Sequence, residues 1–496
     1  MTHPERYARN IPIYYLFQFA TGFLIWVPVW IIFLQDERGL SLTQVGLMEG
    51  VFWVSMMLFE VPTGAIADRF GRRTSLALGG FIFTAGTTMF VLADGFVGLA
   101  ISYVVMATSM TLYSGSGHAL LFDSLRVLGR TREYEKHMGR SEALMTGALL
   151  GAALFGGPMA GLWGLETVFL IGAGTMATAG FVALLLREPP RTEEEFGPDG
   201  LHAAPVSAAD AHDDNSQGVL GYVLEGFRIV LRQRPILWII VLAGIVTVAY
   251  EMPNFFVQPF LRSHGLNPSG GLLDGATWSA LIVPGFAAMS AGSLLAAPFV
   301  ARVGERRAIP LLMFGGAFLF IPLLIFNHIS IVAPIAILGG IHAAIRPIAT
   351  GYINRRIRSD QRATVLSIFE LMMAAQMAVI VPLISASADV IDFRFAYGLS
   401  IGVVLTFGVA FLIIWRRSHR RDQADVLRRI SLRPAPQAVA QAIAVAPDGT
   451  TIGVHANGVP TRGIPTNGVE PHANGNGTSP VPGPTPDPAP TRQDRS

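Results

Sequence analysis

Twelve apolar segments recur along this chain of 496 residues, and each is long enough to cross the hydrocarbon core of a bilayer as a helix. A single span needs about 20 predominantly apolar residues. Helices are favoured in lipid because every backbone N–H and C=O group is satisfied within the segment. The sequence therefore predicts an all-α membrane protein with 12 transmembrane helices. The predicted spans are residues 11–34, 42–66, 74–93, 97–121, 140–163, 165–186, 236–260, 276–300, 308–328, 330–352, 363–387 and 393–415.

The composition agrees with a chain that is solvated mainly by lipid. Only 14% of the residues are charged, whereas a soluble domain carries about 25%. The formal net charge of +2 gives no reason to expect a nucleic-acid partner. The sequence has no cysteine, which excludes disulfides, thiolate metal sites and cysteine nucleophiles. We therefore expect the lipid bilayer, and no nucleic acid, as a partner.

The distribution of Arg and Lys predicts the orientation of the spans. The first apolar segment is too long for the core of a signal peptide, and no small-residue cleavage site follows it, so we expect a retained helix with a cytoplasmic N-terminus. The cytoplasmic loops then hold 22 Arg and Lys residues before the C-terminal tail, and the outer loops hold three, Arg38, Arg262 and Arg394. Such an excess is typical of cytoplasmic loops. The sequence therefore predicts a multi-pass protein of the bacterial inner (plasma) membrane with both termini in the cytoplasm.

The spans fall into two groups of six. Residues 1–187 form the predicted N-terminal six-helix bundle, and residues 236–416 form the C-terminal one. Residues 188–235 are a predicted cytoplasmic linker, and its first part is polar and rich in Ala, Asp and Pro, which is typical of a flexible segment.

Two segments outside the bundles have distinct compositions. Residues 219–234 of the linker have apolar residues at helical spacing and basic ends, which predicts a helix on the membrane surface. Residues 417–496 begin with a basic juxtamembrane stretch and are rich in Pro, Gly and Asn from about Pro434. We expect that stretch to lie on anionic lipid and the rest to be a disordered cytoplasmic tail.

A charged motif lies in the loop after the second predicted span. The chain there reads Gly64-Ala-Ile-Ala-Asp68-Arg69-Phe-Gly71-Arg72-Arg73. This segment resembles the signature loop of the major facilitator superfamily, G-x-x-x-D-R-x-G-R-R, at every defined position, and it occupies the same loop. The resemblance implies a fold of two six-helix bundles and secondary transport of a small solute by alternating access.

The residues of this signature loop also make physical sense by themselves. Gly64 can let a neighbouring helix approach closely, and Gly71 permits the tight reversal that a short loop requires. Asp68 and the Arg side chains can form charge-assisted hydrogen bonds that break and form again as the halves move. In the family, an acidic residue at the inner end of the fourth span pairs with an Arg of this loop. The resemblance implies that Asp123 pairs with Arg72, and a simple helix-terminal charge is the alternative.

The second half carries a diverged copy of the motif in the equivalent loop, Ala301-Arg302-Val303-Gly304-Glu305-Arg306-Arg307. Gly304 aligns with Gly71, whereas Ala301 replaces the aspartate. The two halves therefore look like diverged duplicates, as the halves of this family do. Because the aspartate is lost, we expect the N-terminal half to supply most of the inner latch.

The fifth span ends in Gly157-Pro158-Met-Ala-Gly161, which is similar to the G-P-x-x-G-G motif of the superfamily's antiporters. Leu162 stands in place of the last glycine, and Ala153 stands in place of an upstream glycine. The resemblance favours export by exchange. Close packing of small residues against a neighbouring helix is the alternative interpretation.

Charged side chains inside the predicted spans mark candidate sites, because an ionised group at mid-bilayer costs about 3 kcal/mol or more. Glu49 and Glu60 lie in the second span, and their spacing returns to within about 20° of the same helical face. Glu251 lies in the seventh span beside Pro253, which frees a backbone carbonyl where a helix bends around a site.

Arg346 in the tenth span and Glu370 in the eleventh fall at similar depth, so we expect a buried ion pair that either holds one conformation or opens for a substrate. A carboxyl that couples transport to protons has to titrate near neutral pH, which burial makes possible. A satisfied structural carboxylate is the alternative for each candidate. The candidates for proton coupling, in order, are Glu251, Glu49, then Glu60 and Glu370, with His118 and His342 as weaker ones.

The energy source follows from motifs that the sequence does not contain. We find no phosphate-binding loop for ATP, no H-E-x-x-H metal motif and no G-x-S-x-G elbow, which leaves an ion gradient. We expect a monomer without enzyme activity, cofactor or metal, which binds a small-molecule substrate and protons. The favoured hypothesis is a proton-coupled antiporter that exports an amphipathic or drug-like compound. The alternatives are a symporter or facilitator for a polar nutrient or metabolite, a non-transporting sensor or scaffold, and a membrane-embedded enzyme.

Overall fold

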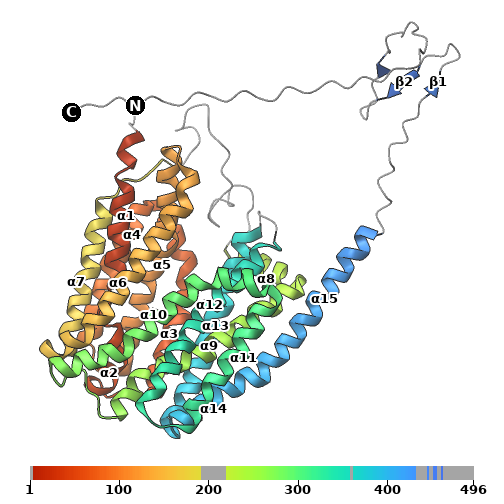
Figure 1. Cartoon of the computed structure of the whole chain (residues 1–496). Coiled ribbons are helices and arrows are strands. Elements are labelled where there is room, and N and C mark those ends of the chain that lie inside the picture. Colours follow the sequence, from red (N-terminus) through yellow and green to blue (C-terminus); the bar gives the residue numbers. More distant parts are fainter. Residues whose placement is uncertain are drawn as a thin grey trace, which may run out of the picture. The chain divides into compact units, whose positions relative to one another are not determined.

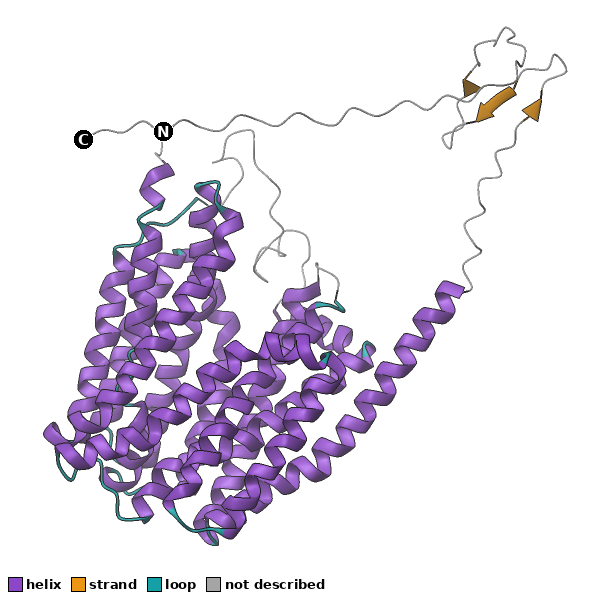
Figure 2. Ribbon diagram, in the orientation of Figure 1, coloured by secondary structure: helices purple, strands orange, loops and turns teal. Residues whose placement is uncertain are grey.

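The computed structural model describes residues 4–190, 219–357 and 361–431, together with eight residues of the C-terminal tail. Within these ranges, 12 helical segments are long and apolar enough to cross a membrane. The predicted number and order of the spans are therefore confirmed. The described residues are almost entirely helical (Figure 2).

The helices form two halves of six spans each (Figure 1). The helices of the N-terminal half are α1 (Asn10–Gly22), α2 (Trp30–Ile32), α3 (Leu42–Phe70), α4 (Arg72–Leu92), α5 (Gly95–Val127), α6 (Tyr134–Trp163) and α7 (Leu165–Leu184). The helices of the C-terminal half are α8 (Val219–Arg232), α9 (Arg234–Ser263), α10 (Leu272–Val303), α11 (Glu305–Ile325), α12 (Val332–Asn354), α13 (Arg362–Val390), α14 (Phe393–Val403) and α15 (Val409–Ser431).

The first span is broken in its middle, so the prediction of one continuous helix over residues 11–34 is wrong. Helix α1 ends at Gly22, and a 3-10 turn over Val27–Val29 leads into α2 and a π-helical turn over Phe33–Glu37. Pro28 has no N–H to donate, and its ring would clash with the carbonyl one turn earlier. Gly22 adds backbone freedom at the same place. These two residues explain the interruption that apolarity alone did not reveal.

The halves meet mainly through two helix pairs, α3 with α13 and α6 with α10, and α2 also contacts α9. We call the end of the protein that carries residues 64–73 the signature end, and the other the opposite end. At the opposite end the two halves share one apolar core, which contains Ile25, Val29 and Ile31 from one half and Phe256, Trp278 and Ile282 from the other. At the signature end, α1, α4, α5 and α7 of the N-terminal half pack around a separate core. The two halves therefore pack against each other through a shared core at the opposite end.

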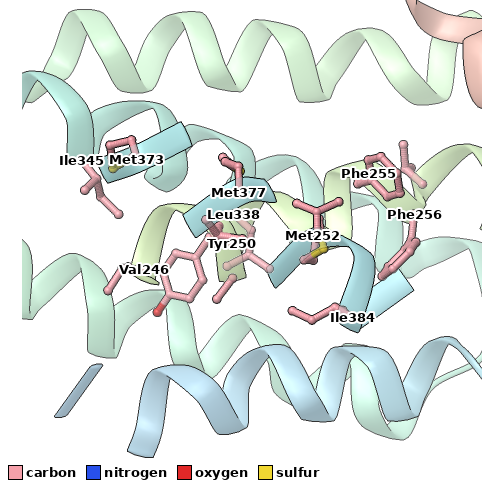
Figure 3. Close-up of a cluster of buried hydrophobic side chains, with 14 of the residues drawn as sticks. Val246, Tyr250, Met252, Phe255, Phe256, Leu338, Ile345, Met373, Met377 and Ile384 are labelled. Carbon is pink, nitrogen blue, oxygen red and sulfur yellow. The ribbon is translucent and has the colours of Figure 1, made fainter. Parts of the chain in front are cut away.

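A cluster of large apolar side chains holds the C-terminal half together around α9 (Figure 3). Helix α9 contributes Val246, Tyr250, Met252, Phe255 and Phe256, which pack against side chains of α12 and α13. Because α9 is buried along most of its length, it is a firm support for any polar group that it carries.

A helix, α8, lies where the sequence predicts one, and Gly226 lies against Ile368 and Thr364 of α13. The position of α8 on the membrane surface stays a prediction. The part of the linker that the sequence predicts to be flexible lies almost entirely outside the described residues. Three short antiparallel strands, β1 (Ala444–Val445), β2 (Thr451–Val454) and β3 (Pro460–Thr461), occur where the sequence predicted disorder. The rest of the tail lies outside the described residues, so its disorder stays a prediction.

The orientation of the spans is a prediction that the cysteine-free sequence makes easy to test. Position 131 lies at the signature end and position 37 at the opposite end, and both side chains are exposed. We expect a membrane-impermeant maleimide to label Glu37→Cys in intact spheroplasts, and to label Thr131→Cys only after permeabilisation. The reverse pattern would invert the predicted topology.

Candidate functional site

Glu251 lies in the middle of α9, and His342 of α12 is its neighbour. The distance from His342 Nε2 to Glu251 Oε2 is 3.4 Å. His342 Nδ1 lies 3.1 Å from the carbonyl oxygen of Thr247. Because a carbonyl oxygen only accepts, Nδ1 is the nitrogen that donates in this contact, and Nε2 faces the carboxyl group. Glu251 Oε2 is buried and makes no hydrogen bond within the described part of the chain. The imidazole of His342 and the carboxyl group of Glu251 therefore form a pair that can hold one proton between them.

Glu49 faces this pair from the other half of the protein. Its carboxyl group accepts a hydrogen bond from the Trp53 side chain and is close enough to Glu251 for the two charges to interact. Phe52 packs edge-on against Trp53 and against Tyr103 of α5, with ring centroids 5.8 and 6.0 Å apart. Two carboxyl groups from opposite halves therefore meet beside an aromatic cluster.

A cavity of about 140 Å³ lies next to Glu251 and is lined by both halves. Its polar lining comes from Glu251, Asn254 and Gln258 of α9, and Trp30 of the broken first span covers it from the other half. Phe286, Met289 and several aliphatic side chains complete the wall. Mostly apolar walls with a few convergent polar groups are typical of a binding site for a small molecule.

The predicted pair between Arg346 and Glu370 is present. Arg346 donates to Glu370 Oε1 from Nε at 3.0 Å and from Nη2 at 2.7 Å. The expectation that this pair is buried is wrong, because the side chains are 64% and 49% exposed. Arg346 lies one helical turn after His342 on α12, toward the signature end. At that end the core of the N-terminal half is separate from the core that the two halves share. The pair therefore extends the polar face of α12 from the cavity toward that end.

The other candidates have different surroundings. Glu60 is exposed and lies near the signature end of α3. About three helical turns of α3 separate it from Glu49. His118 of α5 lies 3.8 Å from Glu142 of α6, and both side chains are about half exposed. Neither group belongs to the Glu49–Glu251 cluster.

The signature loop forms the ion pair that the family resemblance implied. Arg72 and Asp123 are directly bonded through Nη1 and Oδ2, and Arg126 lies 3.3 Å from the same carboxyl group. Gly71 has φ of 98°, which a side chain would disfavour. This glycine is the only residue between α3 and α4.

Sequence reasoning missed Glu188, which follows the sixth span. Its two carboxylate oxygens accept hydrogen bonds from the backbone N–H groups of Arg72 and Arg73, each at 2.8 Å. The carboxylate therefore caps the first turn of α4, where unpaired N–H groups favour a negative charge. Only contact across 116 positions in the chain reveals this role.

Two expectations for the signature loop are not met or not tested. In the described part of the chain, no atom of another helix lies within 4 Å of the place where a Cβ on Gly64 would stand, so the expected close approach of a helix is not made there. The side chain of Asp68 lies outside the described part of the structure. Arg69 is exposed and lies over the ring of Phe70.

The C-terminal half also builds a charge cluster at the signature end, so the expectation that the N-terminal half supplies most of it is wrong. Glu305, directly after Gly304, pairs with Arg355 at 2.8 Å and with Arg356 at 2.9 Å. Arg72 follows Gly71 in the same way and pairs with an acidic residue. The two copies therefore place the pair equivalently with the charges exchanged, which is why the missing aspartate was misleading.

The glycines at the end of α6 make close contacts between the halves. A Cβ on Gly157 would overlap the backbone carbonyl of Gly275, and a Cβ on Gly161 would overlap that of Gly271. Gly157 N–H also donates to Ser279 Oγ at 3.1 Å. Pro158 is part-buried between these glycines. These contacts agree with the packing interpretation of this motif, and the packing partner is the other half.

An exchange of charges tests the ion pair in the signature loop. We expect Asp123→Arg to lower transport about tenfold or more, because the new arginine stands beside both Arg72 and Arg126 in a partly buried site. The double variant Arg72→Asp with Asp123→Arg should recover a substantial part of that loss, measured as initial transport rate at equal membrane abundance. An equal loss in the single and double variants would show that the pair itself does not matter.

Twelve membrane helices in two halves, with a cavity that both halves line, define a polytopic membrane transporter. The family model described as "Major Facilitator Superfamily" matches residues 13–339 and 284–446. The chain belongs to that superfamily. Its members transport solutes and are not enzymes.

Curated relatives are similar to parts of the chain. The MFS-type transporter YxaM of Bacillus subtilis (strain 168) is 24% identical over 260 residues, 51% of this chain and 59% of YxaM. The multidrug resistance protein MdtH of Aeromonas salmonicida (strain A449) is 26% identical over 178 residues, 36% of this chain and 43% of MdtH. The quinolone resistance protein NorA of Staphylococcus aureus is 25% identical over 142 residues, 28% of this chain and 35% of NorA. The chain thus aligns with less than two thirds of each relative.

Solved structures share the fold over nearly their whole length. The nucleoside transporter NupG superposes with a TM-score of 0.66 at 12% identity, covering 82% of this chain and 99% of NupG. A bacterial homologue of the human lysosomal transporter Spinster, inward-facing and unoccupied, superposes with a TM-score of 0.64 at 16% identity, covering 84% and 98%. At these identities the likeness supports the fold alone.

Proposed function

We propose that this protein exports an amphipathic compound from the cytoplasm in exchange for protons. The observation that carries the proposal is that Glu49 and Glu251 come from opposite halves and are close enough for their charges to interact, and that Glu251 lines the cavity. Two anionic carboxylates repel each other strongly where water is scarce. Either a proton or a cationic group of a substrate relieves that repulsion, so the two compete for one site. Competition of this kind produces exchange.

The walls of the cavity favour an amphipathic substrate over a strongly polar one. Trp30, Phe286 and Met289 offer apolar and polarisable surface, and Met-rich or aromatic walls adapt to ligands of different shape. With the predicted topology, the signature end faces the cytoplasm, and a substrate would enter from that side. The names of MdtH and NorA refer to drug resistance, which agrees with export.

A second function is favoured by the Arg346–Glu370 pair. This pair is exposed and lies one turn from His342, so it can exchange its partners for the charged or polar groups of a solute. A proton symporter or facilitator for a polar metabolite would use such a pair. NupG, which shares the fold, is named a nucleoside transporter.

Everted membrane vesicles that contain the protein separate the two functions. The vesicles are acidified by respiration, loaded with a pH-sensitive dye and challenged with lipophilic amines and with polar metabolites. Exchange predicts that the dye signal recovers when a lipophilic amine is added, because protons leave as the compound enters. Uptake of a polar metabolite by whole cells, with no dye recovery for any amine, would favour the symporter and overturn the export proposal.

A further inference from the structure

The break in the first span exposes backbone groups that the other half satisfies. Between Gly22 and Trp30 the regular helical hydrogen bonding is interrupted, and Val29 has φ and ψ of −131° and 4°, outside the helical range. Backbone N–H and C=O groups that are buried without a partner are costly. For Val27, Pro28 and Ile31 the partners come from α9 and α10 of the C-terminal half.

Gln258 of α9 makes two of these hydrogen bonds with one side chain. Its Nε2 donates to the carbonyl oxygen of Val27 at 2.9 Å, and its Oε1 accepts from the N–H of Ile31 at 3.1 Å. The indole Nε1 of Trp278 donates to the carbonyl oxygen of Pro28 at 2.7 Å. Gln258 is 5% exposed and Trp278 is fully buried. An amide is suited to this place because it supplies one donor and one acceptor.

The same residue also lines the cavity. Gln258 and Glu251 are seven residues apart, which places them two turns apart on one face of α9, and both contact the cavity beside Asn254. A molecule in the cavity, or a change of charge at Glu251, therefore acts next to the side chain that holds the halves together. The bonds between Gln258 and the first span can break without a lasting penalty when this end opens, since water then reaches the freed backbone groups.

We propose that Gln258 is the gating residue of the opposite end. It holds the broken first span against the C-terminal half while the cavity is closed on that side, and its release allows that side to open. Trp278 supports it through a separate hydrogen bond. The gate depends on alternating access in this family, and does not depend on whether the coupling ion is a proton or on which solute is moved.

The cysteine-free sequence allows spin labels to report the gate directly. One pair of cysteines, Glu37→Cys with Ser269→Cys, spans the halves at the opposite end, and Thr131→Cys with Arg307→Cys spans them at the signature end. All four side chains are exposed. Distances are measured by double electron–electron resonance in lipid nanodiscs, with no substrate added.

We expect Gln258→Leu to raise the ratio of opposite-end-open to opposite-end-closed protein about tenfold, the effect of losing one to two buried hydrogen bonds. The first pair of labels should gain a longer distance and the second pair a shorter one. Gln258→Asn should act in the same direction, because the shorter side chain cannot reach both backbone groups. Trp278→Phe should act in the same direction with a smaller effect, and it serves if Gln258→Leu does not fold.

The control is Gln376→Leu, which removes an amide that donates to Met372 O within its own half. We expect that variant to keep the wild-type distances. Unchanged distances in both Gln258→Leu and Trp278→Phe would overturn the proposal, and so would an equal shift in Gln376→Leu.

Discussion

Replacing Glu251 with Gln should abolish proton release during transport, leaving less than about 5% of the dye recovery that wild-type vesicles show. The substitution keeps the size and most of the hydrogen-bonding capacity of the side chain, but removes the group that can bind and release a proton. It also leaves His342 without an acidic neighbour, so the imidazole loses the partner that lies 3.4 Å away. The measurement is dye recovery in everted vesicles after a lipophilic amine is added.

A second assay separates lost coupling from lost folding. Exchange of labelled for unlabelled substrate across the membrane needs alternating access but no net movement of protons, so Glu251→Gln should retain it with Glu49 still present to bind the cationic group of the substrate. Glu166→Gln is the matched control, because Glu166 is an exposed carboxylate that pairs with Arg38 away from the cavity, and such pairs contribute little. Dye recovery at the wild-type level in Glu251→Gln would remove this residue from the coupling step and leave Glu49 as the candidate.

The sequence predicts much of this fold because the bilayer reduces the choices. Twelve apolar segments and a signature loop suffice to predict the spans, the two halves and the pairing of Arg72 with Asp123. The carboxylates could also be named, since each charged residue in an apolar segment stands out from its neighbours. Their grouping could not, because periodicity within α3 relates Glu49 to Glu60, whereas the structure brings Glu49 to Glu251 of the other half.

The features that were missed all depend on contacts between distant segments. Glu188 reads as a linker residue, yet it caps α4. In the sequence, Gln258 looks like an ordinary polar residue near the end of a span. Its hydrogen bonds to the backbone of the first span can be recognised only once the break in that span is known. Arg346 and Glu370 are paired as expected, but their side chains are exposed, and this exposure depends on the arrangement of the two halves at the signature end. Spacing along one helix does not contain that information.

Replacing Gly157 with Ala should lower transport about tenfold or more, although it adds a single methyl group. In this structure the new Cβ would overlap the carbonyl group of Gly275, a backbone group that cannot move aside without shifting α10. Overpacking of this kind costs about 1–3 kcal/mol, and the cost falls only on the state in which the halves are closed at the opposite end. The measurement is the initial transport rate at equal abundance of protein in the membrane.

Gly151→Ala is the matched control for this prediction. It makes the same change on the same helix, and no atom lies within 4 Å of the new Cβ. Alanine favours helices over glycine by about 0.5–1 kcal/mol, so neither variant should lose activity through a weaker α6. We expect Gly151→Ala to stay within about twofold of the wild type, and the labels at positions 37 and 269 to move apart in Gly157→Ala alone. Equal transport rates in the two variants would mean that Gly157 does not act by letting the halves close at the opposite end. The likeness of this segment to the antiporter motif would then need an explanation other than packing between the halves.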